Sequence, residues 1–158
     1  MYIDRMKRVR KFIAGLPAHK LKMSNWIELD YMPNGSIPPV KTMVQASCGT
    51  TACIAGWVQV MSGQVTGYNE YSASNDAQHY LGLSNAEADA LFLLHWPVFL
   101  FDKFELDVIT KDNLIRFDKL KPDTRKAAIL RILDYIIEFG FTWLPAGVQS
   151  QRISQFGH

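Results

Sequence analysis

The last third of the chain contains the pattern that most constrains the fold. Between Lys121 and Gly140, isoleucine and leucine recur at intervals of three and four residues, which places them on one face of an α-helix. A glycine at the end of such a stripe is a common helix terminator. The pattern predicts a long amphipathic helix that buries one face against other elements. Its apolar positions are Ile129, Ile132, Leu133, Ile136 and Ile137.

Three further segments indicate the rest of the architecture. Apolar residues also recur at helical spacing between Tyr2 and Leu16, so a helix is expected there. Ser84 and Glu87 form a capping-box pattern, in which each side chain accepts a hydrogen bond from the other residue's amide, and this predicts a helix that begins after Ser84. An extended segment between Trp26 and Tyr31 is the main strand candidate.

The length of 158 residues indicates one domain, and an apolar content of 48% is enough for a core without disulfides or metal. We therefore expect a mainly α fold, as a compact single domain of several short helices with at most a minor two- or three-stranded sheet. The globular domain is expected to span residues 1–148. The polar segment 149–158 is expected to be a mobile C-terminal tail.

Charge is distributed unevenly along the chain. The formal net charge of +2 is too small to indicate a nucleic-acid or membrane partner by itself. The first helix nevertheless has a basic face, which is either a solvated surface or a contact for a protein partner or, with weaker support, for nucleic acid. The run HWPVFLFDKF contains aromatics that either anchor an interface or belong to the core. The expected contact residues are Arg5, Arg8, Lys11, Trp96, Phe99 and Phe101.

The sequence shows no targeting or membrane segment. No charge-free apolar run reaches the length of a membrane span, and the charged start of the chain lacks the apolar core of a signal peptide. The two cysteines of such a protein are expected to be thiols rather than a disulfide. We therefore expect a cytoplasmic protein without a membrane partner.

Both cysteines lie in the segment QASCGTTACIAGW, which raises the question of thiol chemistry. Cys53 is expected near the start of a helix, where the helix dipole lowers the pKa of a thiol. A cysteine-dependent hydrolase or transferase would then use His95, or else His79, as base and Gln45 in the oxyanion hole. The spacing departs from the papain-type pattern, so the expectation is no catalytic residue and two small buried thiols.

The same segment contains the elements of two other kinds of site. Gly49, Thr50 and Thr51 supply a flexible turn, hydroxyls and amides for an anion pocket, or the threonines merely cap the helix. No lysine follows them as it does in a Walker loop. A metal site would combine Cys48, Cys53, His79 and His95, whose spacing is unlike that of common zinc sites. We expect neither a cofactor nor a metal.

The stretch CGTTACIAGW at residues 48–57 resembles a signature, CGTxxCxAGW or CGTxxCxAGH, of a protein family. Its members are small uncharacterised proteins encoded by phages, prophages and other bacterial mobile elements. The flanking segments LPAHKLKMSNW and YLGLSNAEADALF are similar to that family as well, so the resemblance covers about residues 12 to 97. It implies a mobile-element setting and assigns no chemistry to any residue.

Setting, size and the weak catalytic patterns together suggest a function. We expect a non-enzymatic accessory protein that binds and modulates a host protein in the bacterial cytoplasm, for example an inhibitor of a defence system of the anti-CRISPR kind. The alternative is a cysteine-dependent enzyme, or a nucleotide- or phosphate-binding protein, that uses the segment from Cys48 to Trp57.

Overall fold

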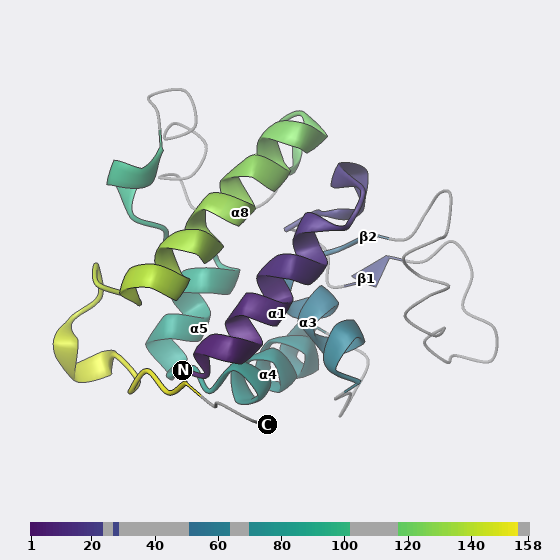
Figure 1. The fold of residues 1–158 in the computed structure, drawn as a ribbon. Helices are drawn as coiled ribbons and strands as arrows, with labels where there is room; N and C mark the ends of the chain where they lie inside the picture. Colours follow the sequence, from purple (N-terminus) through teal and green to yellow (C-terminus); the bar gives the residue numbers. More distant parts are fainter. Residues whose placement is uncertain (24–26, 29–50, 64–69, 102–116, 155–158) are drawn as a thin grey trace.

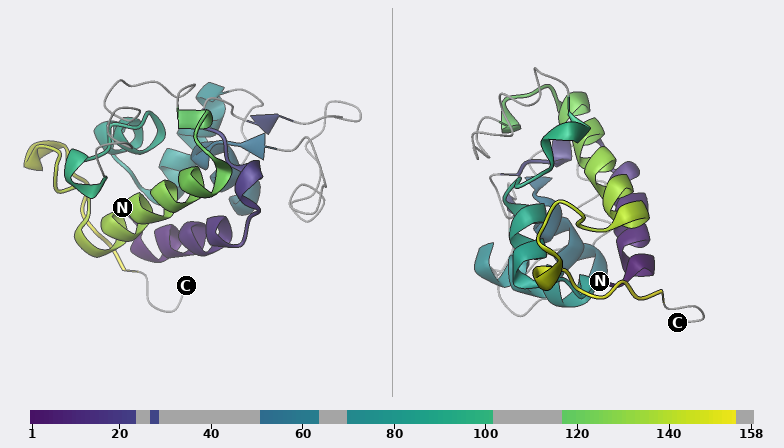
Figure 2. Two further views of the ribbon diagram at one scale, coloured as in Figure 1. Left: turned by 90° about the horizontal axis from the view of Figure 1, so that it is seen from above. Right: turned by 90° about the vertical axis from the view of Figure 1, so that its left-hand side faces the viewer.

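The computed structural model describes residues 1–23, 27–28, 51–63, 70–101 and 117–154, and element labels follow Figure 1. The fold is mainly α-helical, as predicted. Its helices form two layers (Figure 2). One layer contains α1 (Ile3–Ala14) and α8 (Pro122–Phe139), and the other contains α3 (Ile54–Ser62), α4 (Glu70–Leu81) and α5 (Asn85–Phe92).

The first layer is an antiparallel helix pair. The apolar stripes predicted for both helices face the core, so the helix periodicity is confirmed. Near the C-terminus of α1, Lys126 Nζ of α8 donates to the carbonyls of Ala14 and Leu16, at 2.8 and 2.7 Å. The Ala14 carbonyl is one that an ending helix leaves without an intrahelical partner, and Leu16 lies just beyond the C-cap Gly15. Farther along the pair, Arg10 and Asp134 form an exposed ion pair at 2.8 Å.

Proline marks the start of helix α8, and glycine marks its end. Pro122 occupies its first turn after Lys121, and no side chain caps the start. Gly140 ends it with a φ of 79°, a conformation that favours glycine.

The buried Arg125 joins the start of α8 to neighbouring turns. Its guanidinium donates to three carbonyls, those of Leu21, Asp118 and Leu120. Burial lowers the pKa of Arg125, and the negative charge of Asp118 opposes that shift. Three acceptors compensate for the loss of hydration, which is the condition for burying a cation.

The second layer is centred on α3, which is buried over most of its length. Trp57 is fully buried, and its indole Nε1 donates to the carbonyl of Lys20 at 3.0 Å. Against α4, the buried Gln59 Nε2 donates to Asp76 Oδ2 at 2.8 Å. Gly63 ends α3 in the left-handed conformation.

Helix α5 begins with the predicted capping box. Ser84 Oγ accepts from the amide of Glu87, and Glu87 accepts from the amide of Ser84. Glu87 also binds Ser150, through the amide at 2.7 Å and the hydroxyl at 2.6 Å. Ile153 pairs with Tyr2 as an isolated bridge. The segment expected as a mobile tail is thus hydrogen-bonded to the N-terminal end of the fold up to this bridge, and residues 155–158 lie outside the described residues.

A small antiparallel sheet completes the described fold. Strand β1 (Ile27–Glu28) pairs with β2 (Thr51–Ala52), with Ile27 opposite Ala52. Strand β1 falls within the segment predicted as extended. The described part of the chain also has three short 3₁₀ turns: η1 (Ala18–Lys20) after α1, η3 (Val98–Leu100) after α5 and η4 (Ala146–Val148) after α8. None of the described helices combines the length and apolarity that crossing a bilayer requires.

Candidate functional site

The described part of the cysteine segment is closed and packed. Ala52 and Ile54 are fully buried, as is Trp57. Cys53 is half-buried and is the N-cap of α3, where its Sγ accepts from the amide of Gly56 at 3.4 Å. The expectation that a threonine caps this helix is therefore wrong, because Thr51 lies in strand β2 and the cap falls on Cys53.

The alternative of an anion pocket lacks a helix terminus at the residues proposed for it. The amide end of α3 begins at Ile54, beyond the CGTT residues that would line such a pocket. Thr51 is paired with Glu28 in the sheet instead. Gly49 and Thr50 lie outside the described residues, and none of the hollows described below is lined by Thr51 or Cys53.

The residues proposed for catalysis or metal binding are not brought together. His79 is exposed in the last turn of α4, and His95 is exposed in the loop after α5. No group of three or more His, Cys, Asp or Glu residues in the described part of the chain could hold a metal ion, so Cys53, His79 and His95 form no such site. Gln45 and Cys48 lie outside the described residues.

The residues expected at an interaction surface divide into exposed and structural ones. Arg8 and Lys11 are exposed on α1. Arg5 instead stacks over the rings of Tyr2 and Tyr80, at 4.7 and 4.9 Å, and donates to the carbonyl of Tyr80 at 2.8 Å. Its role is therefore to hold α1 against the end of α4.

The aromatic run divides in the same way. Trp96 and Phe101 are buried and stack with their ring centroids 5.7 Å apart, so they belong to the core. Phe99 is 63% exposed and meets Tyr135 of α8 at 5.4 Å. Phe139 is 50% exposed and also packs against Tyr135, with ring centroids 4.9 Å apart. Only Phe99 of the three predicted aromatics is available to a partner.

A hollow of about 530 Å³ lies where α1 meets α3, and we call it the α1–α3 groove. Phe12 of α1, Leu16 just after that helix and Met61 of α3 form its apolar walls. Arg8 and Lys11 line it as well, because they lie one helical turn before Phe12 and Gly15. The basic residues were predicted, but Phe12 and Met61 were not, since each also fits the apolar stripe of its own helix.

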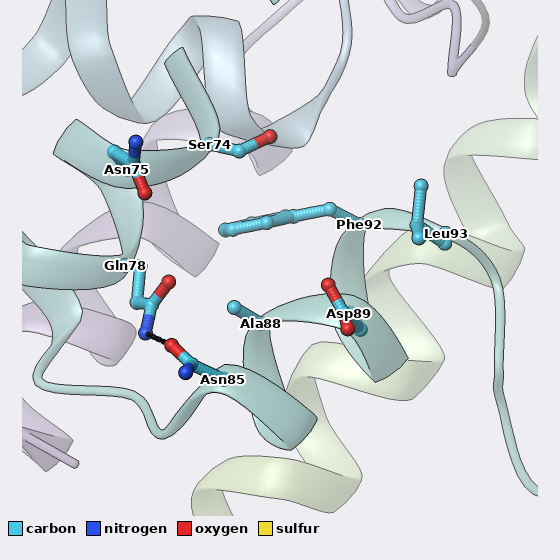
Figure 3. A pocket seen from close by; sticks show the side chains of 8 residues that line it. All are labelled: Ser74, Asn75, Gln78, Asn85, Ala88, Asp89, Phe92 and Leu93. Atoms are coloured by element: carbon cyan, nitrogen blue, oxygen red, sulfur yellow. Dashed lines mark hydrogen bonds between the residues drawn. The ribbon is translucent and has the colours of Figure 1, made fainter. Parts of the chain in front are cut away.

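A second hollow, of about 570 Å³, lies between α4 and α5 (Figure 3), and we call it the α4–α5 cleft. Ser74, Asn75 and Gln78 line it from α4. Asn85 and Asp89 line it from α5, together with Ala88 and Phe92. Sequence reasoning missed this site, because isolated amides on two short helices have no spacing that distinguishes them from solvated faces.

An amide pair spans the α4–α5 cleft. Gln78 Nε2 donates to Asn85 Oδ1 at 2.7 Å and to the carbonyl of Leu83 at 3.2 Å. A backbone carbonyl can only accept, so the Gln78 atom that faces it must be the nitrogen. The Gln78 oxygen and the Asn85 nitrogen are then the atoms that this pair has left for a ligand. The cleft thus presents a defined acceptor beside a defined donor.

Comparison with models of known protein families, with curated proteins and with solved structures finds no match to this chain. Any assignment of function therefore starts from the two hollows and the residues that line them.

Proposed function

We propose that this chain is a non-enzymatic accessory protein of a phage or mobile element, and that its α1–α3 groove docks an acidic, amphipathic segment of a host protein. Because mobile elements encounter host defences, we propose a component of a bacterial defence system as the host protein. The single observation that carries the docking proposal is the combination, in one hollow, of apolar walls and a basic rim. The resemblance to mobile-element proteins supports the setting.

The walls suit the apolar face of a helix or short strand. Phe12 is half-buried and rests on the core through Trp57, with ring centroids 5.9 Å apart. Met61 is half-buried and unbranched, so it adapts to the side chain that packs against it. Complete burial of one leucine-sized side chain contributes about 1.5–3 kcal/mol. One or two such anchors are typical of a helix bound in a groove.

The rim determines the charge of the partner. Arg8 and Lys11 are exposed, and none of the described residues that line the groove is acidic. A basic rim around an apolar centre accelerates encounter with an acidic partner and disfavours a basic one. The chemistry of the groove therefore matches a segment with apolar residues on one face and glutamate or aspartate at its edges.

The alternative function uses the segment from Cys48 to Trp57 for catalysis or for nucleotide binding. Either activity needs that segment to open on a cleft. Its described part is packed, with Trp57 fully buried and Cys53 engaged as a helix cap. The contacts of these residues account for them as parts of the core and give less support to the alternative.

A synthetic peptide tests the docking proposal. The probe is a helix of about 15 residues with leucines at one face and glutamates elsewhere, long enough to be marginally helical in water. Its control has lysine in place of every glutamate. Fluorescence anisotropy should show binding of the acidic peptide alone. Equal binding of the two peptides, or binding of neither, would contradict the proposal.

Charge reversal in the protein locates the binding. The double variant Arg8→Glu and Lys11→Glu should weaken binding of the acidic peptide by at least about tenfold, which corresponds to about 1.4 kcal/mol. The matched control reverses Lys119 and Lys121, two exposed lysines that do not line the groove. An equal loss in both double variants would mean that net charge, rather than the groove, attracts the peptide.

A further inference from the structure

We infer that the α4–α5 cleft binds a neutral sugar unit, held by the amide pair Gln78–Asn85 and the carboxylate of Asp89. This site shares no lining residue with the α1–α3 groove, so the inference is independent of the proposed docking function.

The polar groups of the cleft match hydroxyls better than charges. A sugar hydroxyl can donate and accept at once, and vicinal hydroxyls do so side by side. The Gln78 oxygen accepts and the Asn85 nitrogen donates, which fits two such neighbouring groups. Asp89 lies on α5, one helical turn beyond Asn85 (Figure 3). Its carboxylate can accept a charge-assisted hydrogen bond from a third hydroxyl of the sugar.

The charge of the lining excludes the commoner anionic ligands. Among the described residues that line the cleft, Asp89 is the one with a formal charge, and none is Lys or Arg. A phosphate or carboxylate group would meet that carboxylate without a compensating cation. Leu93, which lines the cleft and is 43% exposed, supplies apolar surface that suits the C–H face of a sugar ring.

Another hollow, of about 390 Å³, adjoins the α4–α5 cleft at the amide pair. The two hollows share Asn75, Gln78 and Asn85. Tyr2 lines the second one beside Gly82, where a Cβ atom would lie 2.8 Å from the Tyr2 ring. Glycine therefore permits the close approach of this aromatic ring. The amide pair lies between the hollows, so a chain of two or three sugar units can span both.

The test uses four defined probes: maltotriose, cellotriose, the N-acetylglucosamine trimer chitotriose, and adenosine, which carries a sugar on a base. Saturation-transfer difference NMR detects contact with the protein, and titration gives the dissociation constant. At least one trisaccharide, or adenosine through its ribose, should bind in the millimolar range or tighter. No binding by any probe at millimolar concentration would overturn the inference.

Two isosteric variants locate the binding. Asn85→Asp removes the donor but retains the oxygen that accepts from Gln78, and an acid is favourable in the first turn of α5. Asp89→Asn removes the charge at nearly constant shape. Each should weaken binding at least about tenfold, which corresponds to the loss of one good hydrogen bond to the ligand, about 1.4 kcal/mol. Asp123→Asn, on the exposed start of α8, is the matched control and should change nothing.

The measurements with adenosine distinguish recognition of the ribose from recognition of the adenine base. If the bound group is the ribose, adenosine binding depends on Asp89 and is lost with a dideoxy analogue that lacks the vicinal hydroxyls. Adenosine binding that survives Asp89→Asn and the loss of those hydroxyls would show recognition of the base edge, and this would overturn the inference. Circular dichroism of each variant checks that the helical fold is retained.

Discussion

The α1–α3 groove and the α4–α5 cleft have similar volumes but opposite chemistry. The groove has apolar walls and a basic rim, whereas the cleft has amides, a hydroxyl and one carboxylate. The groove wall Phe12 rests on the buried Trp57, so its shape depends on core packing. The cleft depends on the hydrogen bonds of Gln78, which are local to two helices. The groove should therefore respond to changes in the core, and the cleft to single polar atoms.

The packing of the helices explains why the two hollows differ. Helix α3 is apolar and buried over most of its length. Near its end, the apolar Met61 lines the groove together with residues of α1. Helix α4 turns its small residues Ala73 and Ala77 and the bonded Asp76 to the core, whereas Asn75 and His79 are exposed. The face that α4 and α5 share with solvent is therefore polar.

Removal of Trp57 should have the largest effect. Trp57→Ala deletes a fully buried indole, its contact with Phe12 and its hydrogen bond to Lys20. The free energy of unfolding in urea should fall by about 3–5 kcal/mol. Trp143→Ala, at a half-buried site, is the control and should cost clearly less. Similar losses for the two tryptophans would contradict the link between groove and core.

The buried bond between Gln59 and Asp76 connects α3 of the groove to α4 of the cleft. Gln59→Leu keeps the volume but removes the donor, so the free energy of unfolding should fall by about 1–3 kcal/mol. The exposed Gln149→Leu should change it by less than about 0.5 kcal/mol. A neutral result at Gln59 would mean that helix packing alone holds the two regions together.

Salt should distinguish the two hollows in one titration series. Binding of the acidic peptide to the groove should weaken by roughly tenfold between about 0.05 and 0.5 M NaCl, because the rim residues Arg8 and Lys11 are exposed and screened. Binding of a neutral sugar to the cleft should stay constant over the same range. Parallel salt dependence of the two ligands would refute the assigned difference in chemistry.

The ion pair between Arg10 and Asp134 should have the smallest effect. Both side chains are partly exposed, at 35% and 55%, so Asp134→Ala should lower the free energy of unfolding by about 0.2–1 kcal/mol. The hydrogen bond to Asp134 raises the pKa of Arg10, so the stabilising effect of the arginine charge is lost only as pH rises through that raised value. Stability curves at pH 7 and at pH 9 should show the same small difference between the variant and the parent protein.

Part of the fold was predictable because it depends on neighbours in the sequence. The capping box of Ser84 and Glu87 joins residues three positions apart, and the structure has it as predicted. The terminators Gly15 and Gly140 are equally local. The misplaced cap at the cysteine segment shows the limit of such patterns. Strand pairing draws Thr51 into β2, so the helix starts later and Cys53 becomes its cap.

The sites were less predictable than the helices. Arg8 and Lys11 stood out by charge, but the apolar walls of the groove were indistinguishable from core positions. The run HWPVFLFDKF contains Trp96 and Phe101, which are buried, and Phe99, which is exposed, although all three are aromatic. Composition does not separate them, because burial depends on the helix that packs over each ring.

By itself, the sequence determined that this protein is mainly helical, where α1 and α8 lie and where α5 begins, because periodicity and capping act over one helical turn. The tertiary structure alone decided which faces meet. It placed Arg125 against carbonyls that include that of the distant Leu21, and it set Gln78 beside Asn85 between two helices. The Arg125 contact closes a loop of 104 positions, and the Gln78–Asn85 contact depends on how α4 and α5 pack, so no local pattern encodes either.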